Sequence, residues 1–247
     1  MSLSPPWNPG NLFVAWWQII EQYTKRDLTY ARNRLPALAG LASRAASTWS
    51  AAYLAGVWKE HLWFFLLWET GNNLDAIRQT RYYAPSWSWA SATSTISWHA
   101  FSQRIIVQAF PDAIPYGYLA DKTSIIQAIT IKHAECTYFE SGPFMPPMQG
   151  YISVDGHIVD VSVSEFKKNK GSLIHYDVQD EGINGLNDSL LIVAEESEDT
   201  GLRKQGIVIR PCSEDSSVFE RVGYWHYGRQ WEENGFVETA LSNIKLV

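Results

Sequence analysis

The sequence predicts an α+β protein in which N-terminal helices pack on a C-terminal antiparallel β sandwich or barrel. Two observations predict it: the spacing of apolar residues changes along the chain, and ten of the twelve tryptophans lie before residue 100. Helical spacing dominates the first part, and short alternating runs dominate the rest. We therefore expect a helical subdomain over residues 1–80 and an antiparallel β subdomain over residues 81–247, joined in one continuous globule.

Three helices are predicted in the N-terminal subdomain. In the first, apolar residues recur at three- and four-residue steps, which is typical of an amphipathic helix. Pro36 is tolerated only in the first turn of the second helix. The last two turns of the third are apolar on nearly every face, so we expect them to be buried all round. The first helix covers residues 12–23, the second runs from Pro36 to about Ser47, and the third covers residues 49–69.

After residue 100, short β-rich runs alternate with turn signals. Asp155-Gly156 predicts the clearest hairpin, because a type I′ turn requires positive φ at both central positions. We expect the acidic stretch 195–199 to be a tip in solvent. The predicted strands are residues 105–110, 124–139, 151–154, 157–163, 172–178, 189–194, 206–212, 218–227 and 237–247.

Composition and charge restrict the partners. Aromatic residues make up 14% of the chain and charged residues 19%, as in a compact aromatic-rich protein. A net charge of −6 argues against nucleic acid, whose phosphates select a basic face. The N-terminus has no secretory signal, and the longest apolar run, 61–68, is far shorter than the roughly 20 residues of a membrane span. We expect a cytoplasmic protein without a membrane span or a nucleic-acid partner.

The segment Tyr82–Ser91 (YYAPSWSWAS) combines a restricted backbone with two indoles. Pro85 has a fixed φ and holds Ala84 in an extended conformation. If the segment continues as a strand, Trp87 and Trp89 lie on one face, about 6.6 to 6.8 Å apart. Such a face suits either the lining of a pocket or the seam between the helical and β layers, and packing at the seam is the favoured role of both indoles.

The same segment resembles the YRAPSWSWAS signature that follows the conserved domain of fungal heterokaryon-incompatibility proteins. In this segment, Tyr83 stands where the family has Arg. Residues 17–43 resemble that family's W..iVe.Ys.R.LT...DkLpAlsGlA stretch, with Asn33 where the family has Asp. The resemblance implies a C-terminal region of this family without its N-terminal domain, so that domain's part in cell death does not carry over. Further blocks of resemblance lie at residues 53–58, 66–68, 206–211 and 219–224.

Common catalytic and cofactor motifs are absent from the sequence. It has no Gly-x-Ser-x-Gly elbow, no glycine-rich phosphate loop, no Gly-x-Gly-x-x-Gly fingerprint and no His-Glu-x-x-His or Cys-x-x-Cys pair. We therefore expect neither a metal nor a cofactor. An enzyme of this kind would depend on shape, hydrogen bonds and a single acid or base.

Eight side chains are candidates for a functional site. Tyr83, His99 and His61 are the candidate catalytic donors, acids or bases, although a core imidazole bonded to the backbone is the favoured role of His61. Arg81 has the donors to bind a carboxylate or carbonyl, although an ordinary surface arginine is the favoured alternative. The predicted substrate-binding residues are Trp87, Trp89, Trp98, Arg81 and Trp225.

The favoured function is a cofactor-independent enzyme of fungal secondary metabolism. It would be a cyclase or Diels-Alder-type pericyclase that acts on a small apolar or polyene-like substrate in an aromatic pocket. One alternative is a non-enzymatic interaction or regulatory module, and another is a degenerate incompatibility protein without its own activity. A mostly apolar pocket of about 300 to 1,000 Å³ beside residues 85–89 would favour the enzyme, and a filled interior the module.

Overall fold

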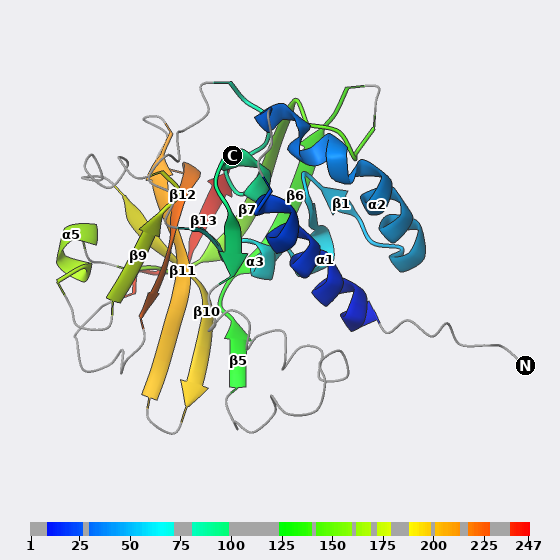
Figure 1. Cartoon of the computed structure of the whole chain (residues 1–247). Coiled ribbons are helices and arrows are strands. Elements are labelled where there is room, and N and C mark those ends of the chain that lie inside the picture. Colours follow the sequence, from blue (N-terminus) through cyan, green and yellow to red (C-terminus); the bar gives the residue numbers. More distant parts are fainter. Residues whose placement is uncertain are drawn as a thin grey trace, which may run out of the picture.

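The N-terminal helices pack against one large, mostly antiparallel sheet (Figure 1), which confirms the predicted α+β class. A single hydrophobic cluster contains side chains from both parts. This computed structural model describes residues 9–26, 30–71, 81–98, 124–139, 142–159, 162–168, 172–178, 188–198, 201–212, 217–227 and 238–247.

Two long helices form the N-terminal layer. Helix α1 (Pro9–Thr24) has Phe13, Trp16 and Ile20 at helical spacing, and all three are at most 3% exposed. Helix α2 (Arg34–Trp49) follows a short 3-10 turn, η1 (Ala31–Asn33), and has Pro36 in its first turn. The first two predicted helices are therefore confirmed, with bounds a few residues wider than expected.

The predicted third helix is wrong. Residues 49–69 contain the end of α2 and then a hairpin that turns at Ala55-Gly56, where φ is 45° and 99°. Positive φ at both positions is what a two-residue type I′ turn requires. Burial on all sides was predicted correctly, because residues 64–68 are at most 1% exposed. The elements are β1 (Tyr53–Leu54), β2 (Val57–Trp58), η2 (Lys59–His61), α3 (Leu62–Phe65) and β3 (Trp68–Thr70).

Within the described ranges, nine strands of the C-terminal part form one sheet. Figure 1 shows its arrangement. The predicted strand 105–110 lies outside the described residues. Before the large sheet, β4 (Ile96–Trp98) pairs with β3, so the pairing crosses the predicted boundary at residue 80. The strands of the large sheet are β5 (Ser124–Gln127), β6 (Thr130–Thr137), β7 (Gln149–Gly156), β8 (Ile158–Val159), β9 (Ser172–Tyr176), β10 (Ser189–Glu198), β11 (Gly201–Pro211), β12 (Val218–Tyr227) and β13 (Ser242–Leu246).

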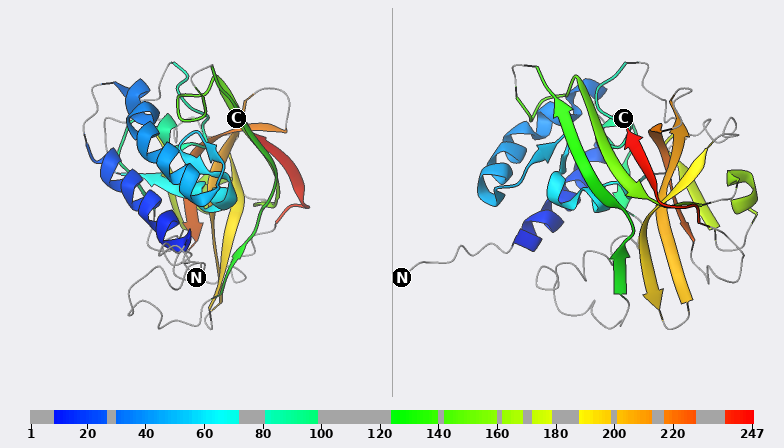
Figure 2. Two further views of the ribbon diagram at one scale, coloured as in Figure 1. Left: turned by 90° about the vertical axis from the view of Figure 1, so that its right-hand side faces the viewer. Right: turned by 180° about the vertical axis from the view of Figure 1, so that it is seen from behind.

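The first and last strands in the order of the large sheet, β5 and β6, are consecutive along the chain. The order runs β5-β10-β11-β12-β13-β7-β6, with β8 paired to β10 and β9 to β12. Because only Ala128 and Ile129 separate β5 from β6, one chain segment pairs with β10 at its start and with β7 at its end. Figure 2 shows the resulting curvature of the sheet. A sandwich or a barrel was predicted, and the described strands form one curved, mostly antiparallel sheet.

Two local predictions in the β part are wrong. Asp155 and Gly156 form no turn: they end β7 and pair with Asn243 and Ser242 of β13. Gly156 serves close packing instead, because a Cβ there would lie 2.8 Å from Cδ1 of Leu191. The described part of the acidic stretch, residues 195–198, is not a solvent tip either, since β10 continues to Glu198 and buries Glu196 completely. Asp199 lies outside the described residues.

The sheet buries side chains on both faces. The face toward the helices belongs to the main cluster with Trp16, Trp68, Trp87 and Trp89. The opposite face carries a smaller cluster that includes Trp225, Tyr227 and Phe166, the last from the short helix α5 (Val163–Phe166). The rings of Trp225 and Tyr227 lie 5.4 and 5.9 Å from that of Phe166, so these two residues of β12 share a face.

The hairpin turn at Gly56 gives a prediction for stability. A Cβ at this position would lie 2.6 Å from Nε1 of Trp89, and φ is +99°. Strain and overpacking together predict that Gly56→Ala lowers the free energy of unfolding by about 2–4 kcal/mol. Urea unfolding followed by tryptophan fluorescence measures the change.

The matched control is Gly40→Ala in α2, where a Cβ meets no atom within 4 Å. This substitution should raise the free energy of unfolding by about 0.5–1 kcal/mol, because glycine lowers helix stability by that amount. Equal effects of the two substitutions would contradict the structural role of Gly56.

Candidate functional site

The segment Tyr82–Ser91 does not continue as a strand. A turn at residues 86–88 is followed by the 3-10 helix η3 (Trp89–Ser91), and Ser88 caps it by accepting a hydrogen bond from Ala90 N at 3.1 Å. Trp87 and Trp89 therefore do not share a strand face. Both are fully buried, which agrees with the favoured packing role.

The carbonyl groups of the Ala55-Gly56 turn hold the second half of the segment. Nε1 of Trp89 and Nε1 of Trp16 donate to Gly56 O at 2.9 and 3.0 Å. Oγ of Ser88 donates to Ala55 O at 2.5 Å. One tight turn thus joins helix α1 and the segment, so this half of the motif is structural.

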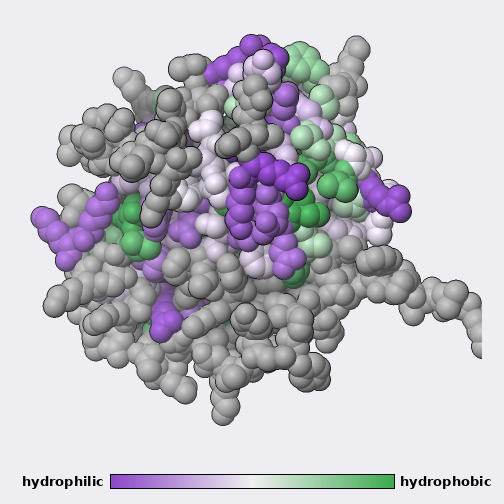
Figure 3. Space-filling view, in the orientation of Figure 1, coloured by the Kyte–Doolittle hydropathy of each residue, from purple (hydrophilic) through white to green (hydrophobic). Residues whose placement is uncertain are grey.

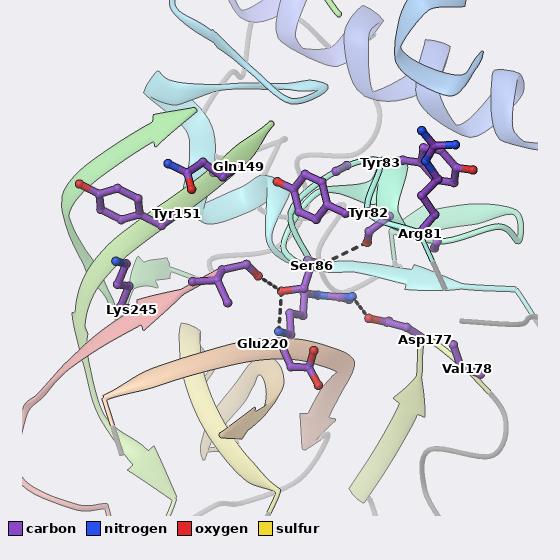
Figure 4. A pocket seen from close by; sticks show the side chains of 16 residues that line it. Arg81, Tyr82, Tyr83, Ser86, Gln149, Tyr151, Asp177, Val178, Glu220 and Lys245 are labelled. Atoms are coloured by element: carbon purple, nitrogen blue, oxygen red, sulfur yellow. Dashed lines mark hydrogen bonds and ion pairs between the residues drawn. The ribbon is translucent and has the colours of Figure 1, made fainter. Parts of the chain in front are cut away.

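The first half of the segment borders a cavity of about 500 Å³ (Figure 4). Its other walls come from the start of β7, the residues after β9, β12 and the end of β13. The volume lies within the range of about 300 to 1,000 Å³ that is usual for small-molecule sites. The aromatic lining residues are Tyr82, Tyr83 and Tyr151, and the charged ones are Arg81, Asp177, Glu220, Arg221 and Lys245.

Arg221 is buried in the wall of this cavity. Its Cζ lies 3.2 Å from the centroid of the Trp68 ring. Nη2 donates to Trp68 O, and Nη1 forms an ion pair with the Asp177 carboxylate. A buried guanidinium is costly unless it is paired and hydrogen-bonded, so these contacts account for its position.

Ser86 connects two walls of the cavity. Its backbone N–H donates to Val247 O at 3.1 Å, and its hydroxyl donates to the same oxygen. The hydroxyl also accepts the backbone N–H of Arg221 at 2.9 Å. Figure 4 shows Ser86 at the centre of this network. Because its hydroxyl already donates one hydrogen bond and accepts another, we assign Ser86 a structural role, in which it positions the walls of the cavity.

The more open part of the cavity holds polar groups with few partners. Arg81 is exposed and forms no ion pair or side-chain hydrogen bond within the described part of the chain. Lys245 is also exposed, and its Nζ lies 4.4 Å from the centroid of the Tyr151 ring. Tyr83 is half-buried, and among the described residues its hydroxyl has no hydrogen-bond partner. These groups are available to a ligand.

The other predicted site residues lie elsewhere. His61 is half-buried with its ring 4.5 Å from that of Phe13, and burial lowers its pKa. Nε1 of Trp98 donates to Phe64 O at 3.3 Å. Trp225 lies under α5, on the other face of the sheet.

Of the eight predicted site residues, Arg81 and Tyr83 line the cavity. His99 lies outside the described residues. The four tryptophans are at most 1% exposed and do not line the cavity, so their predicted contact with substrate is replaced by a packing role.

Sequence reasoning missed several lining residues. Tyr151 lies on an outward-facing position of β7, between buried Gly150 and Ile152. Lys245 lies on an outward-facing position of β13, between buried Ile244 and Leu246. Their alternation with buried residues shows that they face outward. It does not show that these strands border the segment Tyr82–Ser91.

A carboxyl–imidazole pair lies close to Arg221. Oε2 of Glu69 is 3.6 Å from Nε2 of His175. Burial raises the pKa of Glu69 to about 7, although Arg221 opposes this shift and Glu21 adds to it. Burial also lowers the pKa of His175. Both shifts favour the uncharged forms, so near pH 7 Glu69 is about half protonated and the pair is not a permanent salt bridge.

Two further properties concern only the described ranges. There, no group of three or more His, Cys, Asp or Glu residues is placed to hold a metal ion. None of the helices in these ranges has the length and apolar character to cross a membrane.

No protein-family model matches the chain, and comparisons with curated proteins and with solved structures give no match either. The resemblance to heterokaryon-incompatibility proteins therefore stays a prediction.

The raised pKa of Glu69 predicts a pH-dependent stability. Between about pH 4.5, the usual pKa of this group, and about pH 7, the folded state binds more protons than the unfolded state. The contribution of Glu69 to stability therefore falls as pH rises through this window. Glu69→Gln should remove this loss, so its stability relative to the wild type should rise from pH 5 to pH 8 by on the order of 1–3 kcal/mol.

Urea unfolding of both proteins at four pH values measures this difference. Comparing the variant with the wild type cancels the contribution of His175 to a first approximation. A difference that stays constant from pH 5 to pH 8 would mean that Glu69 ionises like an exposed carboxyl group.

Proposed function

We propose that the protein is a small-molecule enzyme that works without a cofactor, and that the cavity beside residues 81–86 is its active site. The observation that carries the proposal is a cavity of about 500 Å³ with an available arginine and an available tyrosine hydroxyl in its wall. Ligand sites of this size combine apolar surface with a few polar groups that orient the ligand.

The lining suits cyclisation or isomerisation of an unsaturated substrate. Three tyrosine rings offer flat apolar surface, and holding a flexible chain in a reactive conformer contributes about 7–11 kcal/mol. Tyr83 carries a neutral donor for charge that develops on a substrate oxygen, an interaction worth about 2.7–4 kcal/mol where it is well placed. The charged lining favours a substrate with a polar end over a wholly apolar one.

A second candidate is an interaction module. An apolar groove of about 260 Å³ lies between α1 and α2 and is lined by Ile19, Leu41, Ala45 and Trp49, among others. Leu41 is 53% exposed. Figure 3 shows apolar side chains gathered over the region of these helices. An apolar side chain of a partner protein would fit this groove, whose polar lining residues are Arg44 and Thr48.

The enzyme hypothesis predicts a loss of activity in Tyr83→Phe. The purified protein is incubated with unsaturated ketones and acids and with fungal extracts, and products are identified by mass spectrometry and chiral chromatography. Loss of the donor should reduce the rate by about 10²- to 10³-fold without changing the unfolding curve.

The matched control is Tyr30→Phe, because Tyr30 is 55% exposed and does not line the cavity. It should leave the rate unchanged. If Tyr83→Phe is as active as the wild type, Tyr83 is not the donor. If no compound is converted, the proposal of an enzyme is wrong.

A further inference from the structure

We propose that the cavity selects unsaturated organic carboxylates, with Arg81 as the residue that binds the carboxylate and Lys245 as a second cation facing it. This rests on the proposed function in one respect, the use of the cavity as a ligand site. It adds the charge of the ligand and the residues that recognise it.

The charge of the lining is opposite to that of the chain. Among the side chains that border the cavity, Arg81, Arg221 and Lys245 are cations and Asp177 and Glu220 are carboxylates, which gives 3 − 2 = +1 for the side chains. The whole chain carries −6. A positive site on a negative protein concentrates anions locally, since the walls of a cleft focus its field.

The three cations differ in what they can offer to a ligand. Arg221 is paired with Asp177 and hydrogen-bonded to Trp68 O, so its charge is already compensated within the wall. Arg81 has no ion pair in the described residues. Its planar guanidinium presents donors that match the two oxygens of a carboxylate. Arg81 is thus the strongest candidate for direct contact.

Lys245 is held in place by an aromatic ring. Its ammonium group lies 4.4 Å from the centroid of Tyr151, which is within the distance of a cation–π interaction. This contact keeps the charge on the cavity wall without neutralising it. In Figure 4, Lys245 and Arg81 lie on opposite sides of the cavity, with Tyr82 and Ser86 between them.

The space between the two cations suits an unsaturated body. Tyr82 extends between Arg81 and Gln149 in Figure 4 and presents its ring toward the cavity. Val178 and Val247 add aliphatic surface. Flat conjugated chains stack on aromatic rings, so the lining combines one anion-binding end with an apolar platform. An inorganic anion would leave that platform unused.

Matched acids and esters test this inference directly. Sorbate and cinnamate and their methyl esters are titrated into the full chain by calorimetry or by saturation-transfer NMR at low salt. We expect both acids to bind at least ten-fold more tightly than their esters. Arg81→Gln should weaken the acids ten-fold or more and bring acid and ester to the same affinity. Lys245→Gln should weaken the acids about three- to ten-fold.

Arg32→Gln and Lys59→Gln are the matched controls, because both residues are exposed and neither lines the cavity. They should bind the acids like the wild type, and urea unfolding confirms that every variant is folded. Equal binding of acid and ester, no binding of either at millimolar concentration, or the same loss in Arg32→Gln as in Arg81→Gln would overturn the inference.

The binding test and the activity test can fail separately. Carboxylates that bind through Arg81 but are never converted would contradict the enzyme and leave the anion site intact. Conversion of neutral substrates by a cavity that does not distinguish acid from ester would support the enzyme and refute the anion site.

Discussion

The buried guanidinium of Arg221 is the interaction on which the cavity depends. The guanidinium lies on the Trp68 ring and pairs with Asp177, and the backbone N–H of Arg221 donates to Oγ of Ser86. These partners come from β3, the residues after β9 and the segment Tyr82–Ser91, while Arg221 itself belongs to β12. Removing one partner of such a buried pair typically costs about 3–5 kcal/mol, because the other charge is left uncompensated. Four separate parts of the chain are therefore fixed relative to one another by the side chain and the backbone N–H of one residue.

A second constraint determines which half of the segment reaches the cavity. The Ala55-Gly56 turn accepts hydrogen bonds from Ser88 and Trp89, which draws the second half into the core. Ser86 bonds to Val247 and Arg221, which holds the first half beside the sheet. The indoles are thus committed to packing, whereas Tyr82, Tyr83, Ala84, Ser86 and, at the far end of the segment, Ser91 line the cavity. A segment that looks like one aromatic surface in sequence has two different roles.

Much of the fold follows from periodicity, because burial on one side leaves a pattern. Helices α1 and α2 and most strands of the sheet were predictable for this reason. Residues 49–69 were not, since a stretch buried on all sides has no period to read. The turn predicted at Gly156 was wrong for a related reason. The sequence shows that this residue is a glycine, but not whether a turn or a close neighbour such as Leu191 requires a glycine there.

The residues of the candidate site also fall into a group that the sequence predicts and a group that it does not. Arg81 and Tyr83 were predictable because they are neighbours in sequence of the segment Tyr82–Ser91. Tyr151, Arg221 and Lys245 join them through the pairing of β7 with β13 and of β13 with β12, and the register of distant strands is not encoded by any local pattern. A site assembled from several strands of one sheet is visible only once that register is known.

The contrast between rigid and mobile groups in the cavity bears on how it would work. Ser86, Arg221 and Asp177 hold one another in place, so the wall they form costs a ligand little conformational entropy. Arg81 is exposed and must lose rotamer freedom when it binds, at a cost of about 0.5–1.5 kcal/mol for such a side chain. Lys245 is already oriented by Tyr151. The fixed wall therefore determines which ligand shapes fit. Selection by charge depends on whether the contact with Arg81 offsets the lost rotamer entropy of its side chain, and a carboxylate offsets it more readily than a neutral carbonyl because its hydrogen bonds are stronger.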